Sequence, residues 1–510
     1  MLRDYQKEKI TNPIMRLQGN PDGEFIHIIN GPAGSGKTTA TVIGLFENIK
    51  AWETGFDTNI NNKIENPFYF TQVCPSVDPL KQVVSGDPFY DSMLFIKDTT
   101  KREDIIINIP KKYHQDLEKT APDKIKRLED IGVEFSFTDT AGQVELQYHI
   151  EKGNYIRPLV ISIFSTKILT MEKTLDRHKI LLGEKLDDGS RIFAGDEFHW
   201  GTGSSNEPNY EENTENNESS YSDKTLTAIR SLFPYYDVII GMSATSTVEQ
   251  LGLIDSDLFK HCSTIPKECV QDYQKTFSLN YVDFSLFSVS ERWDDETADL
   301  ALRKAFNRVD NCRFYMHIKH GMNVNSTGLV YTNVATTNGK CTNITQLKKL
   351  VKKMSKDKDY KDYSKQILFY DSKNKAVVLK GNKFEKVGNS LTDCISDIEA
   401  GKYLLVVCVN SATVGVDCKA WTYEFYFRPI NKIEKFLSEL QRIYRCIRFN
   451  NKCKDFPYNS ITEYEQSEDF NQDILNRMNT AEIYFCNISD ARGEEIYRQI
   501  DKSSYILKRA

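Results

Sequence analysis

Short apolar runs separated by longer mixed segments are the main pattern of this chain. Runs of four to seven residues rich in Ile, Val, Phe and Tyr are typical of strands that are buried on both faces of a sheet. Such runs predict strands at residues 25–29, 68–74, 133–137, 159–164, 191–194 and 236–240, and again at 328–331, 403–409 and 421–427.

Segments with helical character alternate with these runs. Residues 38–49 follow the first strand, residues 346–365 form a lysine-rich solvated face, and residues 433–443 repeat apolar positions at helical spacing. Strands that alternate with helices predict parallel α/β sheets. The pattern restarts after residue 265, and 510 residues exceed what one hydrophobic core usually supports. We therefore expect two tandem α/β domains, residues 1–265 and 266–510.

One long segment breaks the pattern. Residues 201–224 are rich in Asn, Glu and Ser and contain very few apolar side chains. Such a segment cannot bury enough apolar surface to offset the entropy lost on ordering. We expect a disordered loop there.

The first predicted strand runs directly into a glycine-rich peptide of the form G-x-x-x-x-G-K-[ST]. Strand, glycine loop and helix are the context in which this motif binds nucleotide phosphates through backbone N–H groups and a helix N-terminus. Lys37 is expected to reach the β- and γ-phosphates, and the Thr38 hydroxyl to hold Mg²⁺. The predicted phosphate-binding residues are Gly31, Gly34, Ser35, Gly36, Lys37, Thr38 and Thr39.

Composition narrows the class of protein. The 11 cysteines are scattered and contain no C-x-x-C pair, so neither a zinc site nor a disulfide framework is indicated. The N-terminus has no signal peptide, and no apolar run is long enough to span a bilayer. We expect a cytoplasmic protein without a membrane partner. Richness in Asn, Lys, Ile and Asp points to an AT-rich genome, such as that of a phage or virus. The net charge of −6 gives no sign that the protein binds nucleic acid, although a local basic groove would be enough for such binding.

Two acidic residues follow the run at 191–194. Asp196 and Glu197 are therefore expected at the carboxyl end of a strand, where α/β sheets place ligand sites. Asp196 can hold Mg²⁺, and Glu197 can position and activate an attacking water. The peptide Ser243-Ala244-Thr245 ends another predicted strand in the same half of the chain.

Polar residues also gather in the second half. Gly415 and Asp417 follow the apolar run at 403–409, and Gln441 precedes Arg445 and Arg448. The two arginines are three residues apart, so they share a face if the helix continues. Arginines so placed can clamp a transferring phosphate. The alternative is a solvated arginine face that has no catalytic role.

These motifs, in this order, resemble those of superfamily 2 helicases and translocases. The family's phosphate loop matches residues 31–39, its DExH box 196–199, its S-A-T motif 243–245, its fifth motif 415–417, and its Q-x-x-x-R-x-x-R motif Gln441, Arg445 and Arg448. The opening residues 2–6 look like the L-R-x-Y-Q start of DNA-directed members, in which the glutamine, here Gln6, reads adenine. Residues 75–76, 165–166 and 331–333 look like strand-contacting motifs. Tyr444 departs from the glycine usual in the sixth motif.

The resemblance implies two tandem RecA-like P-loop domains with parallel central sheets. It implies an ATP-dependent helicase or translocase in which Thr38 and Asp196 hold Mg²⁺ and arginines of the second domain complete the site. A nucleic-acid strand would lie across both domains, held through its phosphates. The opening residues and a similarity to phage-encoded branched-DNA helicases favour DNA over RNA. Proteins of replication, recombination or repair would be the natural partners.

Two other functions remain open from the residues alone. The peptide Asp139-Thr140-Ala141-Gly142-Gln143 follows a predicted strand and resembles the D-x-x-G switch of Ras-like GTPases. The guanine-reading N-K-x-D motif is missing, because residues 451–455 hold one residue too many. The third possibility is a nucleic-acid-binding module that ATP switches without unwinding.

Overall fold

A computed structural model of the 510-residue chain describes most of its secondary structure. The described residues are 2–32, 34–42, 44, 68–75, 77–85, 105–152, 155–196, 227–243, 259–282, 294–332, 342–371, 375–409, 418–427, 446, 449, 455–458, 460–486, 498 and 507–508. The chain divides into two compact units, one comprising Met1–Gly31 and Ser35–Ile265 and the other Pro32–Gly34 and Pro266–Ala510. The polar segment 201–224 and the predicted helix at 433–443 lie outside the described residues.

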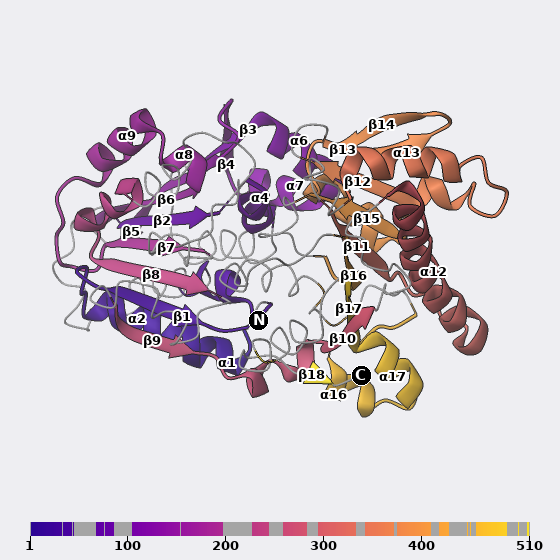
Figure 1. Ribbon diagram of the computed structural model, residues 1–510. Coiled ribbons are helices and arrows are strands. Elements are labelled where there is room, and N and C mark those ends of the chain that lie inside the picture. The colour runs from indigo at the N-terminus through magenta and orange to yellow at the C-terminus, as the bar shows by residue number, and fades with distance from the viewer. Residues whose placement is uncertain are drawn as a thin grey trace. The chain divides into compact units, whose positions relative to one another are not determined.

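One nine-stranded sheet forms the centre of the first unit as far as it is described (Figure 1). Its strands are β1 Ile26–Asn30, β2 Phe68–Cys74, β3 Ile105–Pro110, β4 Val133–Thr138, β5 Gln143–Lys152, β6 Tyr155–Ser165, β7 Arg191–Gly195, β8 Val238–Ser243 and β9 Phe259–Thr264. They lie in the order β4-β3-β5-β6-β2-β7-β8-β1-β9. Neighbours pair in parallel except where β5 meets β3 and β6.

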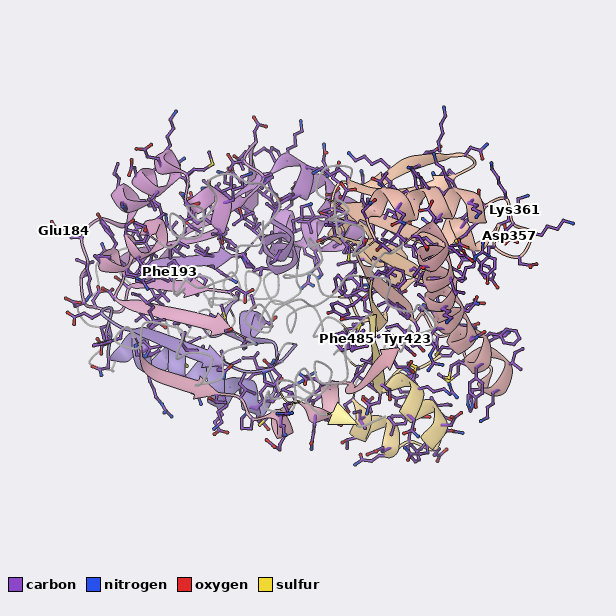
Figure 2. The ribbon with its side chains drawn as sticks, in the orientation of Figure 1. Glu184, Phe193, Asp357, Lys361, Tyr423 and Phe485 are labelled. Atoms are coloured by element: carbon purple, nitrogen blue, oxygen red, sulfur yellow. The ribbon has the colours of Figure 1, made fainter. Side chains whose placement is uncertain are left out.

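Helices accompany this sheet along the chain. They are α1 Asp4–Gln6, the π-helical turn Lys7–Thr11, α2 Asn12–Gly19, α4 Val77–Ser85, α6 Lys111–Thr120, α7 Pro122–Asp130, α8 Thr166–Leu169 and α9 Glu172–Leu182. Helix α4 packs on β2 and β6, and α8 lies against β2. Figure 2 shows Phe193 of β7 within this unit, and its side chain is fully buried.

The second unit repeats the plan with its own sheet. Its strands are β10 Thr276–Val282, β11 Thr327–Tyr331, β12 Ile367–Asp371, β13 Lys375–Lys380, β14 Lys383–Gly388, β15 Leu405–Cys408, β16 Trp421–Tyr426, β17 Thr480–Cys486 and β18 Leu507–Lys508. Their order is β14-β13-β12-β15-β11-β16-β17-β10-β18. Only β13 runs antiparallel to its neighbours in the strands described.

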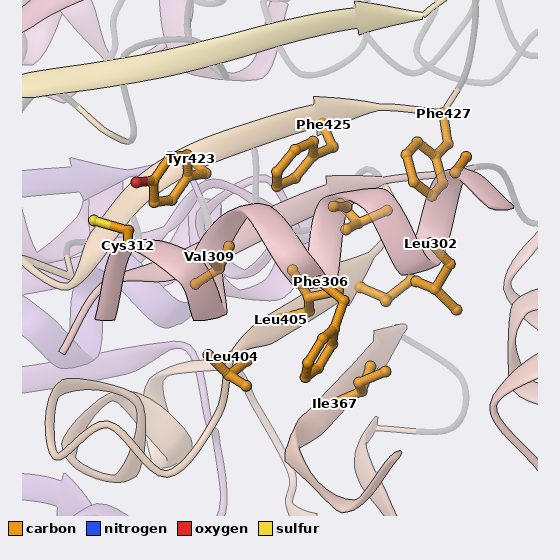
Figure 3. Packing of buried hydrophobic residues seen from close by; sticks show 14 of the residues in the cluster. Leu302, Phe306, Val309, Cys312, Ile367, Leu404, Leu405, Tyr423, Phe425 and Phe427 are labelled. Atoms are coloured by element: carbon orange, nitrogen blue, oxygen red, sulfur yellow. The ribbon is translucent and has the colours of Figure 1, made fainter. Parts of the chain in front are cut away.

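The helices of the second unit include a long one that precedes β11. They are α12 Asp295–His320, α13 Ile344–Met354, α14 Ile395–Glu399, α16 Ile461–Glu465 and α17 Gln472–Met478. The Asp294 carboxylate caps α12 by accepting from the Thr297 backbone N–H, and Gly321 ends it at φ +68°. Figure 3 shows Phe306 and Val309 of α12 packed among apolar residues of the strands.

The central strands of the second sheet are buried on both faces. In β15, Leu405 and Val407 belong to one apolar cluster, whereas Val406 and Cys408 belong to a second cluster. Because successive side chains of a strand point to opposite faces, both faces must be covered. This is why the central strands appear in the sequence as unbroken apolar runs.

Both sheets contain one antiparallel strand in addition to the parallel ones expected. Two residues separate β5 from β6, and two separate β13 from β14. A connection that short joins only antiparallel neighbours, because a parallel crossover needs a dozen or more residues. Gly381 stands first in the second turn at φ +58°, as a type II′ hairpin turn requires.

The structure otherwise confirms the predicted fold class, two tandem RecA-like α/β domains with parallel central sheets. None of the described helices is long and apolar enough to cross a membrane.

The interior of the first unit holds a neutral histidine. His178 of α9 lies 3.0 Å from the Thr71 hydroxyl and 2.8 Å from the Tyr236 hydroxyl, both through its Nε2 atom. Burial lowers the pKa of His178 from 6.5 to about 4. The imidazole is therefore uncharged in the folded protein at neutral pH.

We predict that this histidine makes the first unit sensitive to acid. Between pH 6.5 and 4 the unfolded chain binds a proton at His178 that the folded chain does not, so the free energy of unfolding falls as the pH is lowered. The loss should reach about 3 kcal/mol near pH 4, at roughly 1.4 kcal/mol per pKa unit. Urea unfolding of wild type and His178→Gln across this range measures it. The idea fails if both proteins show the same pH dependence.

Candidate active site

The phosphate loop begins where β1 ends, in the interior of the first sheet. β1 pairs in parallel with β8 on one side and β9 on the other. The Gly31 backbone N–H donates to the Ser243 carbonyl oxygen at 3.2 Å, which ties the start of the loop to the end of β8. The carboxyl ends of β1 and β8 therefore meet at one edge of the sheet, where the loop lies.

Two glycines give the loop its shape. Gly34 and Gly36 adopt φ of +76° and +75°, which side-chain-bearing residues rarely adopt. A Cβ atom at Gly36 would also lie only 2.3 Å from the Gln6 side-chain nitrogen. At Gly36, glycine is required both by backbone conformation and by the close approach of the N-terminal segment.

Lys37 opens the helical segment that follows the loop, and its side chain turns back over the loop. It is 8% exposed, and its ammonium donates to the Gly31 carbonyl oxygen at 2.8 Å and lies 3.5 Å from the Ser35 hydroxyl. The ammonium is thus held inside the curve of the loop. A positive charge at this position suits a polyphosphate cradled by the loop.

Thr38 and Asp196 meet at the same edge. The Thr38 hydroxyl donates to the Asp196 carboxylate at 3.2 Å, although the two residues are 158 positions apart in the chain. Asp196 follows β7, and its backbone N–H donates to the Val73 carbonyl oxygen of β2 at 2.8 Å. The pKa of the buried Cys74 thiol lies well above its usual value, mainly through burial and further through the Asp196 charge.

This pair fits the chemistry of Mg²⁺. The ion is held in nucleotide sites by one or two oxygen ligands of the protein, together with phosphate oxygens and water. A hydroxyl and a carboxylate at hydrogen-bond distance supply such ligands. The described residues contain no cluster of three or more His, Cys, Asp or Glu side chains that would form a metal cage without a nucleotide.

The N-terminal segment is bound to the loop through Ser35. The Ser35 carbonyl oxygen accepts from the Gln6 side-chain amide at 3.0 Å and from the Tyr5 hydroxyl at 2.9 Å. The Gln6 side-chain oxygen accepts from the Arg3 backbone N–H at 2.9 Å. Gln6 is thus placed beside the phosphate loop, with its role toward adenine still a prediction. The hydrogen bond from Tyr5 to Ser35 was not predicted. Its only indication in the sequence was the position of Tyr5 next to Gln6.

Several predicted site residues lie outside the described residues. They are Glu197, Gly415, Asp417, Gln441, Arg445 and Arg448. Cys446, between the two arginines, is described and fully buried in the same apolar cluster as Tyr331, Cys408 and Tyr426. Those three residues end β11, β15 and β16. The backbone at 446 is thereby anchored in the core of the second unit.

Two of the predicted strand-contacting threonines make internal hydrogen bonds. The Thr166 hydroxyl donates to the Cys74 carbonyl oxygen at 3.0 Å. The Thr332 hydroxyl donates to the Thr342 carbonyl oxygen at 2.7 Å. The first bond joins the start of α8 to the end of β2, and the second joins the residue after β11 to Thr342. These structural roles were not predicted from the sequence.

The GTPase-like peptide at 139–143 is far from the phosphate loop. It connects β4 with β5, and β5 is five strands away from β1 in the sheet. At a strand spacing of about 4.8 Å, this amounts to roughly 24 Å. The Gly142 carbonyl oxygen accepts from the Ser165 backbone N–H, and a Cβ atom at Gly142 would lie 2.3 Å from the Ser165 hydroxyl. Packing explains this glycine, and the distance argues against a switch that senses the γ-phosphate.

No protein-family model matches the sequence, and neither does any curated protein. Among solved structures, the chain is similar to Mss116p bound to ssRNA and AMP-PNP, at 11% identity and a TM-score of 0.45, covering 100% of this chain and 77% of that one. It is also similar to S. cerevisiae Dbp5 bound to RNA and ADP BeF3, at 14% identity and a TM-score of 0.46, covering 99% and 89%. A third is Mycobacterium smegmatis helicase Lhr bound to ssDNA and AMP-PNP, at 11% identity and a TM-score of 0.43, covering 99% and 51%.

Proposed function

We propose that this protein is an ATP-dependent nucleic-acid helicase or translocase of the superfamily 2 type, acting on DNA. The observation that carries the proposal is the hydrogen bond between Thr38 and Asp196 beside the buried ammonium of Lys37. A phosphate loop can bind the phosphates of a nucleoside triphosphate, and a hydroxyl together with a strand-end carboxylate can hold its Mg²⁺. The order of motifs along the chain supports the helicase assignment beyond that of a general ATPase.

The residues would divide the work of hydrolysis as follows. The loop N–H groups and Lys37 bind and orient the phosphates, and Thr38 and Asp196 would hold Mg²⁺, which offsets negative charge on the phosphates when bound. Glu197 positions the attacking water and accepts its proton. Gly415, Asp417 and Gln441 belong to the second domain's contribution to the site.

Arg445 and Arg448 would complete the site from the second domain, residues 266–510. Their guanidinium groups stabilise the charge that develops on the transferring phosphoryl group, and this contribution peaks in the transition state. ATP binding would close the domains and hydrolysis would reopen them. Coupling that cycle to a strand held by its phosphates gives directional movement and, at a junction, unwinding.

DNA is the proposed substrate because of the opening residues. The L-R-x-Y-Q start at residues 2–6 is shared with DNA-directed helicases, and its Tyr5 and Gln6 side chains contact the phosphate loop. The proposed setting is the cytoplasm of a cell hosting a phage or virus, with replication, recombination or repair proteins as partners. An ATP-switched binding module without unwinding shares the same nucleotide site, and turnover separates the two.

Hydrolysis measured with different polynucleotides tests this function. We expect ATP turnover to rise when single-stranded DNA is added, to rise less with RNA, and to show no preference for GTP. Lys37→Ala should abolish turnover in every condition, since it removes the charge that faces the β- and γ-phosphates. A GTP preference without any polynucleotide response would contradict the proposal, and strand-separation assays distinguish a helicase from a switched module.

A second prediction separates the two acidic candidates. Glu197→Gln should leave ATP binding largely intact and lower turnover by roughly 10²- to 10⁴-fold, because the water is no longer activated. Asp139→Asn is the matched control, because it is an equal change of charge in the connection between β4 and β5, which lie seven and five strands from β1. It should retain wild-type turnover. Equal damage in both variants, measured by steady-state turnover and nucleotide binding, would favour the GTPase-like alternative.

The third prediction concerns the arginines. Arg445→Ala and Arg448→Ala should each lower single-turnover hydrolysis strongly, with 10³- to 10⁵-fold as the approximate range for arginine fingers. ATP affinity and melting temperature should change little, because the arginines act in the transition state and are expected to face solvent in the free protein. Wild-type hydrolysis in both variants would mean that the second domain does not complete the site.

A further inference from the structure

A concentration of positive charge lies on one part of the second unit. Residues 344–386 contain 13 lysines, five acidic residues and no arginine, within a chain whose net charge is −6. Most of the acids are already paired: Asp371 with Lys348, Asp362 with Lys365, Glu385 with Lys380, and Asp357 with Arg303. Figure 2 labels Asp357 and Lys361 in this part of the second unit. A large excess of lysine remains after these pairs.

Five of the remaining lysines lie on two neighbouring elements, α13 and β14, and are here together called the lysine face. It comprises Lys349, Lys352, Lys353, Lys383 and Lys386, all of them exposed. The first three lie on α13, and the last two lie on β14. The Lys352 ammonium lies 5.5 Å from the centre of the Phe384 ring, so α13 and β14 are neighbours. None of the five makes an ion pair with a described residue.

The helix is built to present these lysines outward. Ile344, Leu347, Leu350, Val351 and Met354 are buried in the core, so the remaining positions of α13 must face solvent. Lys349 and Lys353 are one turn apart, as are Lys348 and Lys352, and like charges at this spacing destabilise a helix. A surface selected only for solubility would avoid this repulsion by mixing charges.

The chemistry of the face identifies its partner as an extended polyanion. Lysine offers a point charge without the planar fork that recognises a single carboxylate or phosphate, so a lysine-only surface suits a repeating backbone. Between residues 344 and 386, no described large apolar side chain is exposed, and α13 has its apolar side in the core. A membrane-binding helix would need that apolar side for insertion.

The position of α13 links the face to the proposed nucleic-acid track. The Thr342 hydroxyl, just before the Asn343 cap of α13, donates to the Phe427 carbonyl oxygen at 3.2 Å, and the Thr342 carbonyl oxygen accepts from Thr332. The start of α13 is thereby fixed at the ends of β11 and β16. This is the edge where residues 331–333 resemble a strand-contacting motif.

We propose that the lysine face binds the phosphate backbone of the nucleic acid, without reading its sequence, as a contact separate from the motif residues. The inference rests on the proposed function, because it assigns that function a second binding surface. Such contacts raise affinity through counterion release, and each one steepens the dependence of binding on salt. Aromatic rings near the face, such as Phe384, are packed against the core rather than offered to bases.

Binding of a labelled duplex and a labelled single strand, measured over about 50 to 200 mM salt, tests the face through this slope. The variant carries Gln at all five lysines of the face. We expect its slope of log K against log salt to fall by roughly 0.9 for every lysine that contacts a duplex phosphate, and its affinity at low salt to fall roughly tenfold or more. Turnover without polynucleotide should stay at the wild-type value. A version with Arg at the same five positions should keep the wild-type slope.

A matched control changes five other exposed lysines to Gln, four of the first unit (Lys111, Lys119, Lys126 and Lys173) and one of the second (Lys267). It has the same net charge as the test variant and should bind like wild type. If wild type binds and the two variants share its slope, the lysine face is not a contact, while the helicase proposal stands. If wild type binds no polynucleotide and its turnover responds to none, both proposals fall. Loss of binding to phosphatidylserine vesicles alone would instead identify a membrane surface and overturn this inference.

Discussion

Parallel pairing of β7, β8 and β1 is the constraint on which the proposed nucleotide site depends. Because these strands run in one direction, their carboxyl ends meet at one edge of the sheet. The residues directly after each strand therefore lie at that edge. The hydrogen bond between Thr38 and Asp196 spans the intervening β8. Neither residue is adjacent to the other in any local element, so a change in strand order would remove the pair while leaving each motif intact.

Strands that are buried on both faces of a sheet could be predicted from the sequence. The strand predicted at 68–74 coincides with β2, and 328–331 lies within β11, because strands covered on both faces must be apolar throughout. Edge strands were predicted only in part: β4 was expected at 133–137, but β14 was not. β14 carries Lys383, Glu385 and Lys386 among its six residues and is the last of the described strands at its side of the sheet. Its only local signal was the Gly381-Asn382 turn.

The long helix α12 was also not predicted, although its signals were present. Asp294 offers an N-cap, Gly321 a C-terminal stop, and small residues such as Ala298 and Ala301 replace the large apolar ones that usually mark a core-facing helix. At the site, the residue types and their order along the chain were sufficient to propose Lys37, Thr38 and Asp196. The contacts of Tyr5 and Gln6 with Ser35 could not be predicted, because they depend on where an N-terminal segment docks in three dimensions.

The docking of that segment has an energetic consequence for the proposed nucleotide site. The Ser35 carbonyl oxygen has two lone pairs, and the side chains of Tyr5 and Gln6 donate to both. A glycine-rich loop left to itself would sample many conformations, and a ligand would have to select one of them at an entropic cost. Here one conformation of the loop is selected during folding, through contacts with residues such as Gln6, which lies 29 residues before Ser35 in the chain. Tyr5 and Gln6 thus act as a fixed template against which the loop is set, and under the proposed function the affinity for phosphate depends on these two residues as well as on the loop itself.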